Sequence, residues 1–128
     1  MSTATATSYT GTFPGRTEEL RHVRRHVAGH LADCPAADAA VLAASELAAN
    51  AVLHSRSRGQ QFTIRVQLHP DHLTVECHDA GGPWRPRRRD DDRPHGLAIV
   101  EALAGGPDGW GTDVTGDGGR TVWARLAW

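Results

Sequence analysis

Residues 45–54 read SELAANAVLH and residues 79–83 read DAGGP, and these two stretches decide how the chain is interpreted. Glu46 and Asn50 are four residues apart, so in a helix both side chains project from one face. An acid and an amide in this arrangement can hold a hydrated cation. Asp79 precedes a glycine-rich turn, where an acid can accept a hydrogen bond from the edge of a nucleobase. Together the two stretches indicate a nucleotide site.

The basic residues restrict which kind of nucleotide site this can be. All 14 of them are arginine, so a P-loop, which needs Gly-Lys-Ser or Gly-Lys-Thr, is excluded. The formal net charge is -1, which gives no general attraction to nucleic acids or membranes. No apolar run reaches the length of a membrane span. We therefore expect no direct contact with nucleic acid or membrane, and a cytoplasmic location with reduced cysteines.

The length of the chain, 128 residues, corresponds to one domain with a single core. Residues 1–8 are rich in Ser, Thr and Ala and lack the basic start and apolar centre of a signal peptide. They are expected to be a disordered lead-in. Residues 9–128 are then expected to form the domain.

Three segments have apolar residues at helical spacing. They cover residues 16–31, residues 36–54, and a stretch from residue 94 or 95 to residue 104. The second segment is apolar around most of its circumference, which predicts a helix buried on several sides. Glu46 and Asn50 are thus expected in an apolar environment, where a charge needs a partner or a function.

Alternating apolar and polar residues predict strands at the remaining positions. A short strand is expected at residues 9–13, a hairpin at residues 62–68 and 73–79, and a closing hairpin at residues 110–115 and 121–128. Asp79 continues the apolar parity of its strand, so it should emerge on the core side of the sheet. These elements predict an α+β fold, a two-layer sandwich with a mixed, mainly antiparallel sheet and three helices on one face.

Simpler interpretations exist for several of these residues. Glu46 could be a partly exposed residue paired with an arginine, and Asp79 could cap a turn. His22, His26 and His30 recur every four residues and could bind zinc, although a solvated helix face is favoured because no acid or thiol joins them. The position of Glu46, Asn50 and Asp79 in one ordered set favours the functional interpretation of the two acids.

Four motifs give the chain a resemblance to a known superfamily. Residues 45–54 resemble the N box of histidine-kinase-type ATPases, the superfamily of gyrase, sensor histidine kinases and MutL. Residues 79–83 resemble the first glycine box, residues 95–100 (HGLAIV) the second, and residues 119–123 (GRTVW) the terminal Gly-x-Thr strand. The motifs occur in the family's order over most of the chain. The chain most resembles the short bacterial branch of anti-sigma factor serine/threonine kinases.

The resemblance implies roles for individual residues and implies ATP and Mg²⁺ as ligands. Asn50 would ligate Mg²⁺, and Glu46 would be the general base for an attacking serine hydroxyl. Asp79 would accept a hydrogen bond from the adenine amino group, with Gly81 allowing close approach of the purine and Thr121 supporting Asp79 or the base. The second glycine box would bind the phosphates through the start of its helix, at His95, Gly96 and Leu97. Residues 87–92 would form a lid over the nucleotide.

The resemblance also implies a function. The chain would be an ATP-binding regulator that phosphorylates a serine on an anti-sigma antagonist and so controls sigma-factor-dependent transcription, and it could form a homodimer. The second glycine box departs from the family at Pro94, where glycine is usual, and proline offers no N–H to a phosphate. The alternative is therefore a non-catalytic module that sequesters a sigma factor or another protein and binds nucleotide weakly or not at all.

Overall fold

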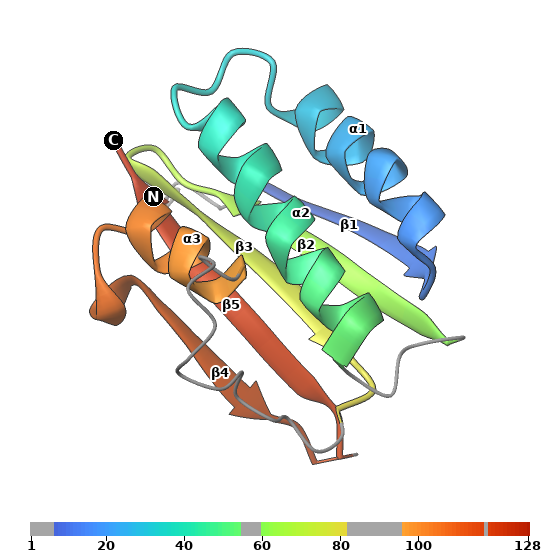
Figure 1. Cartoon of the computed structure of the whole chain (residues 1–128). Helices are drawn as coiled ribbons and strands as arrows, with labels where there is room; N and C mark the ends of the chain where they lie inside the picture. The colour runs from blue at the N-terminus through green and yellow to red at the C-terminus, as the bar shows by residue number, and fades with distance from the viewer. Residues whose placement is uncertain (1–6, 55–59, 82–95, 117) are drawn as a thin grey trace.

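The computed structural model describes residues 7–54, 60–81, 96–116 and 118–128. These residues form two layers, a five-stranded sheet and three α-helices that lie on one of its faces (Figure 1). In chain order the elements are β1 (Thr7–Pro14), the short 3₁₀ turn η1 (Thr17–Glu19), α1 (Leu20–His30), α2 (Ala37–His54), β2 (Gln61–Leu68), β3 (His72–Asp79), α3 (Gly96–Leu103), the 3₁₀ turn η2 (Pro107–Gly109), β4 (Trp110–Val114) and β5 (Arg120–Ala127).

The strands follow the order β1-β2-β3-β5-β4 across the sheet. Each neighbouring pair is antiparallel. The expected α+β two-layer sandwich is confirmed, but the expected mixture of strand directions is wrong for the described residues. Short turns join β2 to β3 and β4 to β5, and such turns can connect only antiparallel neighbours.

The core lies between the helices and the sheet. Alternate residues of the strands point into it from the sheet. Phe62, Ile64 and Val66 of β2 are buried, as are every second residue of β3 and β5 on the same face. On the helix side of the core, α2 contributes mostly small side chains, which let the helix approach the sheet closely. Its buried residues are Ala40, Ala43, Ala44, Leu47, Ala48, Ala51 and Val52.

The N-terminal boundary of the domain differs from the expected one. Thr7 and Ser8, assigned from the sequence to a disordered lead-in, belong to β1 and pair with Leu68 and Gln67 of β2. The pairing of the backbone with β2 outweighs the low apolar content of this segment, because an edge strand needs only one partner. Residues 1–6 lie outside the described residues.

The histidines of α1 form the predicted solvated face only in part, since His30 is exposed whereas His22 and His26 are half-buried. The His26 ring meets Phe13 edge-on with the centroids 5.7 Å apart. The His30 ring stacks on Tyr9 at 4.2 Å. His22 instead pairs with Glu19, at 2.7 Å between Nδ1 and Oε2. Two of the three rings therefore attach α1 to the edge strand β1.

Two absences apply to the described part of the chain only. It contains no group of three His, Cys, Asp or Glu side chains placed to hold a metal ion. In the same residues, no helix has both the length and the apolar character needed to cross a membrane.

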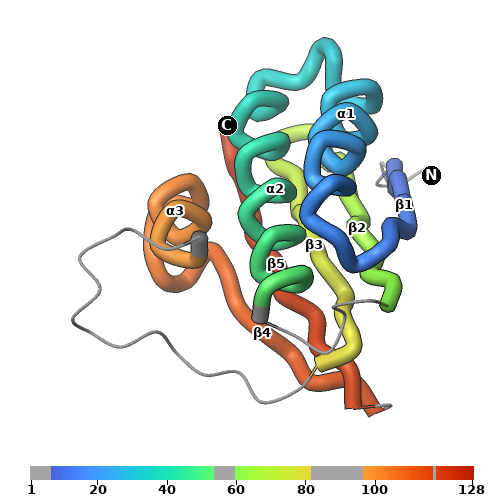
Figure 2. The backbone as a smooth tube through the Cα atoms, turned by 45° about the vertical axis from the view of Figure 1, so that its right-hand side comes forward, coloured from blue at the N-terminus to red at the C-terminus, as the bar shows by residue number. Residues whose placement is uncertain are grey.

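The third helix lies beside α2, on the side away from α1 (Figures 1 and 2). A hydrogen bond connects it to the last hairpin: Trp110 Nε1 at the start of β4 donates to Glu101 Oε1 of α3 at 3.0 Å. The end of β3 and the start of β5 are paired, Asp79 opposite Arg120. The predicted site residues therefore lie on α2, on α3 and at this end of the sheet.

Candidate functional site

Glu46 and Asn50 lie on the flank of α2 that faces away from α1. The opposite flank is identified by Ser45, whose hydroxyl accepts a hydrogen bond from Arg24 Nη1 of α1 at 3.1 Å. Successive helical residues are rotated by about 100°. Glu46 is therefore about 100° and Asn50 about 140° around the helix from Ser45, away from the flank that contacts α1.

The environment of these two side chains is less apolar than the sequence suggested. Both residues are half-buried rather than enclosed, because they flank the buried face of α2 instead of occupying its centre. Within Asn50, however, the amide nitrogen is fully buried and has no hydrogen-bond partner among the described residues. A buried amide without a partner is unfavourable in a folded protein. An acceptor atom of a ligand, such as a phosphate oxygen, beside this nitrogen would relieve the cost, so the amide fits a site for a nucleotide. A metal ion would be held by the other atom of the amide, its oxygen.

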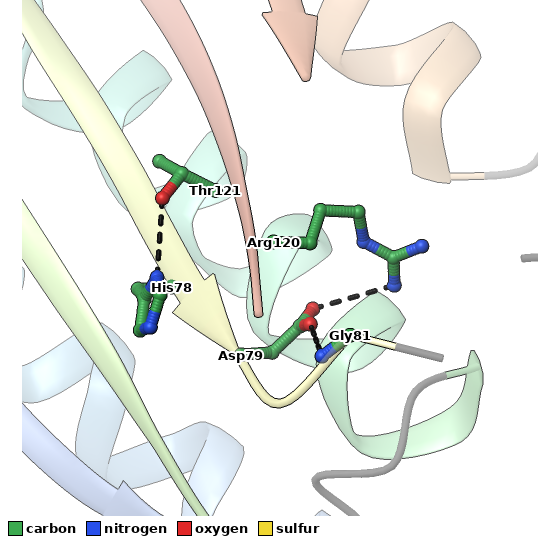
Figure 3. A network of polar contacts seen from close by, with 5 residues as sticks. All are labelled: His78, Asp79, Gly81, Arg120 and Thr121. Carbon is green, nitrogen blue, oxygen red and sulfur yellow. Dashed lines mark hydrogen bonds and ion pairs between the residues drawn. The ribbon is translucent and has the colours of Figure 1, made fainter. Parts of the chain in front are cut away.

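Asp79 is a buried acid at the end of β3, on the helix-covered face of the sheet. It is 3% exposed, as its core-side parity predicted. Its Oδ1 accepts a hydrogen bond from the backbone N–H of Gly81 at 2.7 Å, and its Oδ2 accepts one from Arg120 Nη2 at 3.4 Å (Figure 3). The simpler interpretation, a turn-capping aspartate, is therefore correct for one oxygen, since Oδ1 caps the turn to Gly81. The other oxygen, Oδ2, serves a different partner.

Gly81 has a positive φ of 73°, a conformation that favours glycine. A Cβ atom at this position would collide with the backbone carbonyl oxygen of Gly118, in the turn between β4 and β5. The expected reason for this glycine was close approach of a purine. The structure gives another reason, close approach of two backbone segments, which holds the end of β3 against the start of β5.

Thr121 lies on the face of the sheet away from the helices, which corrects the expectation that its hydroxyl supports Asp79. Its Oγ1 shares a hydrogen bond of 3.1 Å with His78 Nδ1 (Figure 3). The physical reason is the strand period. Val122, Ala124 and Leu126 are buried on the helix side, so Arg120 also points inward and Thr121 points outward.

The second glycine box is only partly within the described residues. The helix α3 is described from Gly96 to Leu103, within the stretch predicted from residue 94 or 95 to residue 104, and Leu97 is half-buried against the core. His95, Pro94 and the expected lid at residues 87–92 lie outside the described residues. The described geometry therefore supplies the helix start but not the loop before it.

Arg120 is the residue that sequence reasoning missed. Its side chain is 7% exposed and pairs with that of Asp79, which is 2% exposed. The signal was present in the sequence, because the apolar alternation of residues 122, 124 and 126 extends backwards to residue 120. The family motif directed attention to the threonine instead of to its neighbour.

Comparison with known proteins identifies the family to which the chain belongs. The chain matches the model of the histidine kinase-like ATPase domain over residues 13–125. A search of curated proteins gives no match. The matched range includes α2 with Glu46 and Asn50, Asp79 at the end of β3, and α3. The chain therefore belongs to the histidine kinase-like ATPase family.

Proposed function

We propose that the chain is an ATP-dependent protein serine/threonine kinase that phosphorylates a serine of an anti-sigma antagonist and so controls sigma-factor-dependent transcription. The observation that carries the proposal is the shared flank of α2. Glu46 and Asn50 lie on it together, turned away from the side that contacts α1, and Asn50 has a buried amide nitrogen with no partner among the described residues. Membership of the family supports the coarser statement, a regulatory ATP-binding domain.

Each residue has one task in this proposal. Asp79 accepts a hydrogen bond from the adenine amino group, and Asn50 ligates Mg²⁺ through its amide oxygen, a hard ligand suited to that ion. Mg²⁺, when bound, neutralises charge on the phosphates. Gly96 and Leu97 at the start of α3 bind the phosphates in this proposal, because backbone N–H groups at a helix start favour anions. His95, which lies outside the described residues, is assigned to the same task.

The transfer step involves Glu46. The serine hydroxyl oxygen of the partner forms a bond to the γ-phosphorus, and the bond from that phosphorus to the β–γ bridging oxygen breaks, so that ADP leaves. The hydroxyl proton passes to the Glu46 carboxylate. General-base catalysis of this kind contributes roughly 10²- to 10⁴-fold to a rate.

A second function is favoured by the contacts of Asp79. Both of its oxygens already accept hydrogen bonds from the protein itself, from Gly81 and from Arg120. If Asp79 does not have to accept a hydrogen bond from adenine, the domain would be a protein-sequestering module with weak or no nucleotide binding. Such a module would need neither Glu46 nor Asn50 for its function.

Calorimetric titration of ATP with Mg²⁺ tests the nucleotide site. Wild type should bind ATP and not GTP, and Asp79→Asn should weaken ATP binding by about tenfold or more, because a hydrogen bond to a charged acceptor is lost. Asn50→Ala should weaken the binding of ATP only when Mg²⁺ is present. Absence of ATP binding by the wild type would refute the kinase and favour the sequestering module.

Transfer of labelled γ-phosphate to a purified anti-sigma antagonist tests the enzymatic step. Glu46→Gln should still bind ATP but lose transfer by roughly 10²-fold or more. Glu18→Gln is the matched control, since Glu18 is exposed at the start of the first helical segment, in η1. Equal transfer by wild type and Glu46→Gln would remove Glu46 from the mechanism.

A further inference from the structure

Arg120 and Asp79 form a buried ion pair at the end of the sheet where the base is proposed to bind. The two residues are direct neighbours in the register of β3 and β5. Their side chains are 7% and 2% exposed, and Figure 3 shows the guanidinium lying over the carboxylate. Burial of a charged pair is expensive unless the two groups satisfy each other, so this contact needs a structural or functional reason.

A structural reason is weak, because Asp79 is already held in place without Arg120. The backbone N–H of Gly81 donates to Oδ1 at 2.7 Å, close to the ideal length. Arg120 Nη2 donates to Oδ2 at 3.4 Å, longer than the usual range of hydrogen bonds. The shorter contact holds the carboxylate more tightly than the longer one.

The longer contact occupies the oxygen that base recognition requires. An N–H group of arginine donates to a carboxylate oxygen as the amino group of adenine would. The Asp79 side chain is 2% exposed, so a nucleobase can reach Oδ2 only if the groups that cover it move. Arg120 is the long, multi-rotamer side chain on this oxygen, whereas Gly81 contributes only backbone.

We propose that the Arg120 guanidinium occupies the base-recognition position on Asp79, so that an adenine nucleotide must displace it from Asp79 to bind. This inference rests on the proposed ATP site, and it assigns to Arg120 the control of the affinity of that site for ATP. When a binding-competent state is only partly populated, the apparent affinity falls in proportion to that population. If Arg120 covers Asp79 in about nine molecules of ten, ATP binding is weakened about tenfold.

Arg120→Met tests the proposal because methionine keeps the length and apolar stem of the side chain but cannot donate to Asp79. Calorimetric titration of ATP with Mg²⁺ should show about tenfold tighter binding than in the wild type, equivalent to about 1.4 kcal/mol. The matched control is Arg125→Met, on the same strand but exposed, and its affinity should equal that of the wild type. Arg120→Lys retains a donor and a charge and should show little of the gain.

Three outcomes separate the inference from the function on which it rests. Tighter binding by Arg120→Met, with Arg125→Met unchanged, is the expected result. If the wild type binds ATP and Arg120→Met binds it equally or more weakly, Arg120 is not a competitor and this inference is overturned alone. If neither protein binds ATP, both the inference and the proposed function are overturned.

A folding defect must not be mistaken for an effect on binding. Circular dichroism and the melting temperature of each variant show whether it is folded before titration. If Arg120→Met does not fold, Arg120→Ala replaces it, because alanine also removes the donor and places no new group beside Asp79. A gain in affinity in the same direction supports the competition, and an unchanged or lower affinity overturns it.

Discussion

Among the described glycines with positive φ, replacement by alanine should destabilise the protein most at Gly81. Two effects combine at this position. The positive φ of 73° costs a residue with a Cβ about 1–2 kcal/mol. The new methyl group would also collide with the carbonyl oxygen of Gly118, and relieving such an overlap costs roughly 1–3 kcal/mol. The expected loss is therefore roughly 2–5 kcal/mol, a large part of the stability of an ordinary domain.

Two other glycines supply controls that separate these effects. Gly105 follows α3 with a φ of 83°, and nothing lies within 4 Å of the position that an added Cβ would take. Gly105→Ala should therefore lose only the backbone part, about 1–2 kcal/mol. Gly29 lies inside α1 with open space around it, so Gly29→Ala should gain about 0.5–1 kcal/mol.

Equilibrium unfolding in urea measures all three variants on one scale. The free energies of unfolding should fall in the order Gly29→Ala, wild type, Gly105→Ala, Gly81→Ala. A loss by Gly81→Ala no greater than that of Gly105→Ala would refute the predicted overlap, since the carbonyl of Gly118 would then not restrict this position. The same substitution should also weaken ATP binding, because the Gly81 N–H positions Oδ1 of Asp79.

Two further predictions concern titratable groups away from the nucleotide. Burial, with a smaller contribution from His30, holds the pKa of His26 below its ordinary value of 6.5. The unfolded chain therefore binds a proton at His26 more readily than the folded protein, and the free energy of unfolding should fall as the pH decreases below about 6.5. In His26→Phe this fall should be smaller between about pH 7.5 and pH 5.5. A fall equal to that of the wild type would show that His26 is not its cause. Burial also raises the pKa of the Cys77 thiol, so a thiol reagent should modify the half-buried Cys34 in the native protein and Cys77 only after unfolding, whereas equal rates would contradict the enclosure of Cys77.

The fold followed from the sequence because its signals are local. Alternation over residues 62–68 and 73–79 corresponds to β2 and β3, and the apolar circumference of residues 36–54 corresponds to α2. The N-terminal boundary did not follow, since Thr7 and Ser8 gain their strand conformation from pairing with β2. Nor did the histidines of α1, because their periodicity does not reveal that β1 presents Tyr9 and Phe13 to them.

The site illustrates where a motif and a periodicity disagree. The family motif directs attention to Thr121, whereas the alternation of β5 directs Arg120 toward Asp79. The alternation prevailed, because turning Thr121 inward would also turn Val122 and Ala124 out of the core and lose their burial. A strand in a one-sided sheet cannot present a single residue to the other face without a bulge, and the ladder between β3 and β5 is continuous from His72 to Asp79. The chemistry at this end of the sheet is therefore that of a carboxylate facing an arginine, and the proposed nucleotide would compete with that arginine for Asp79.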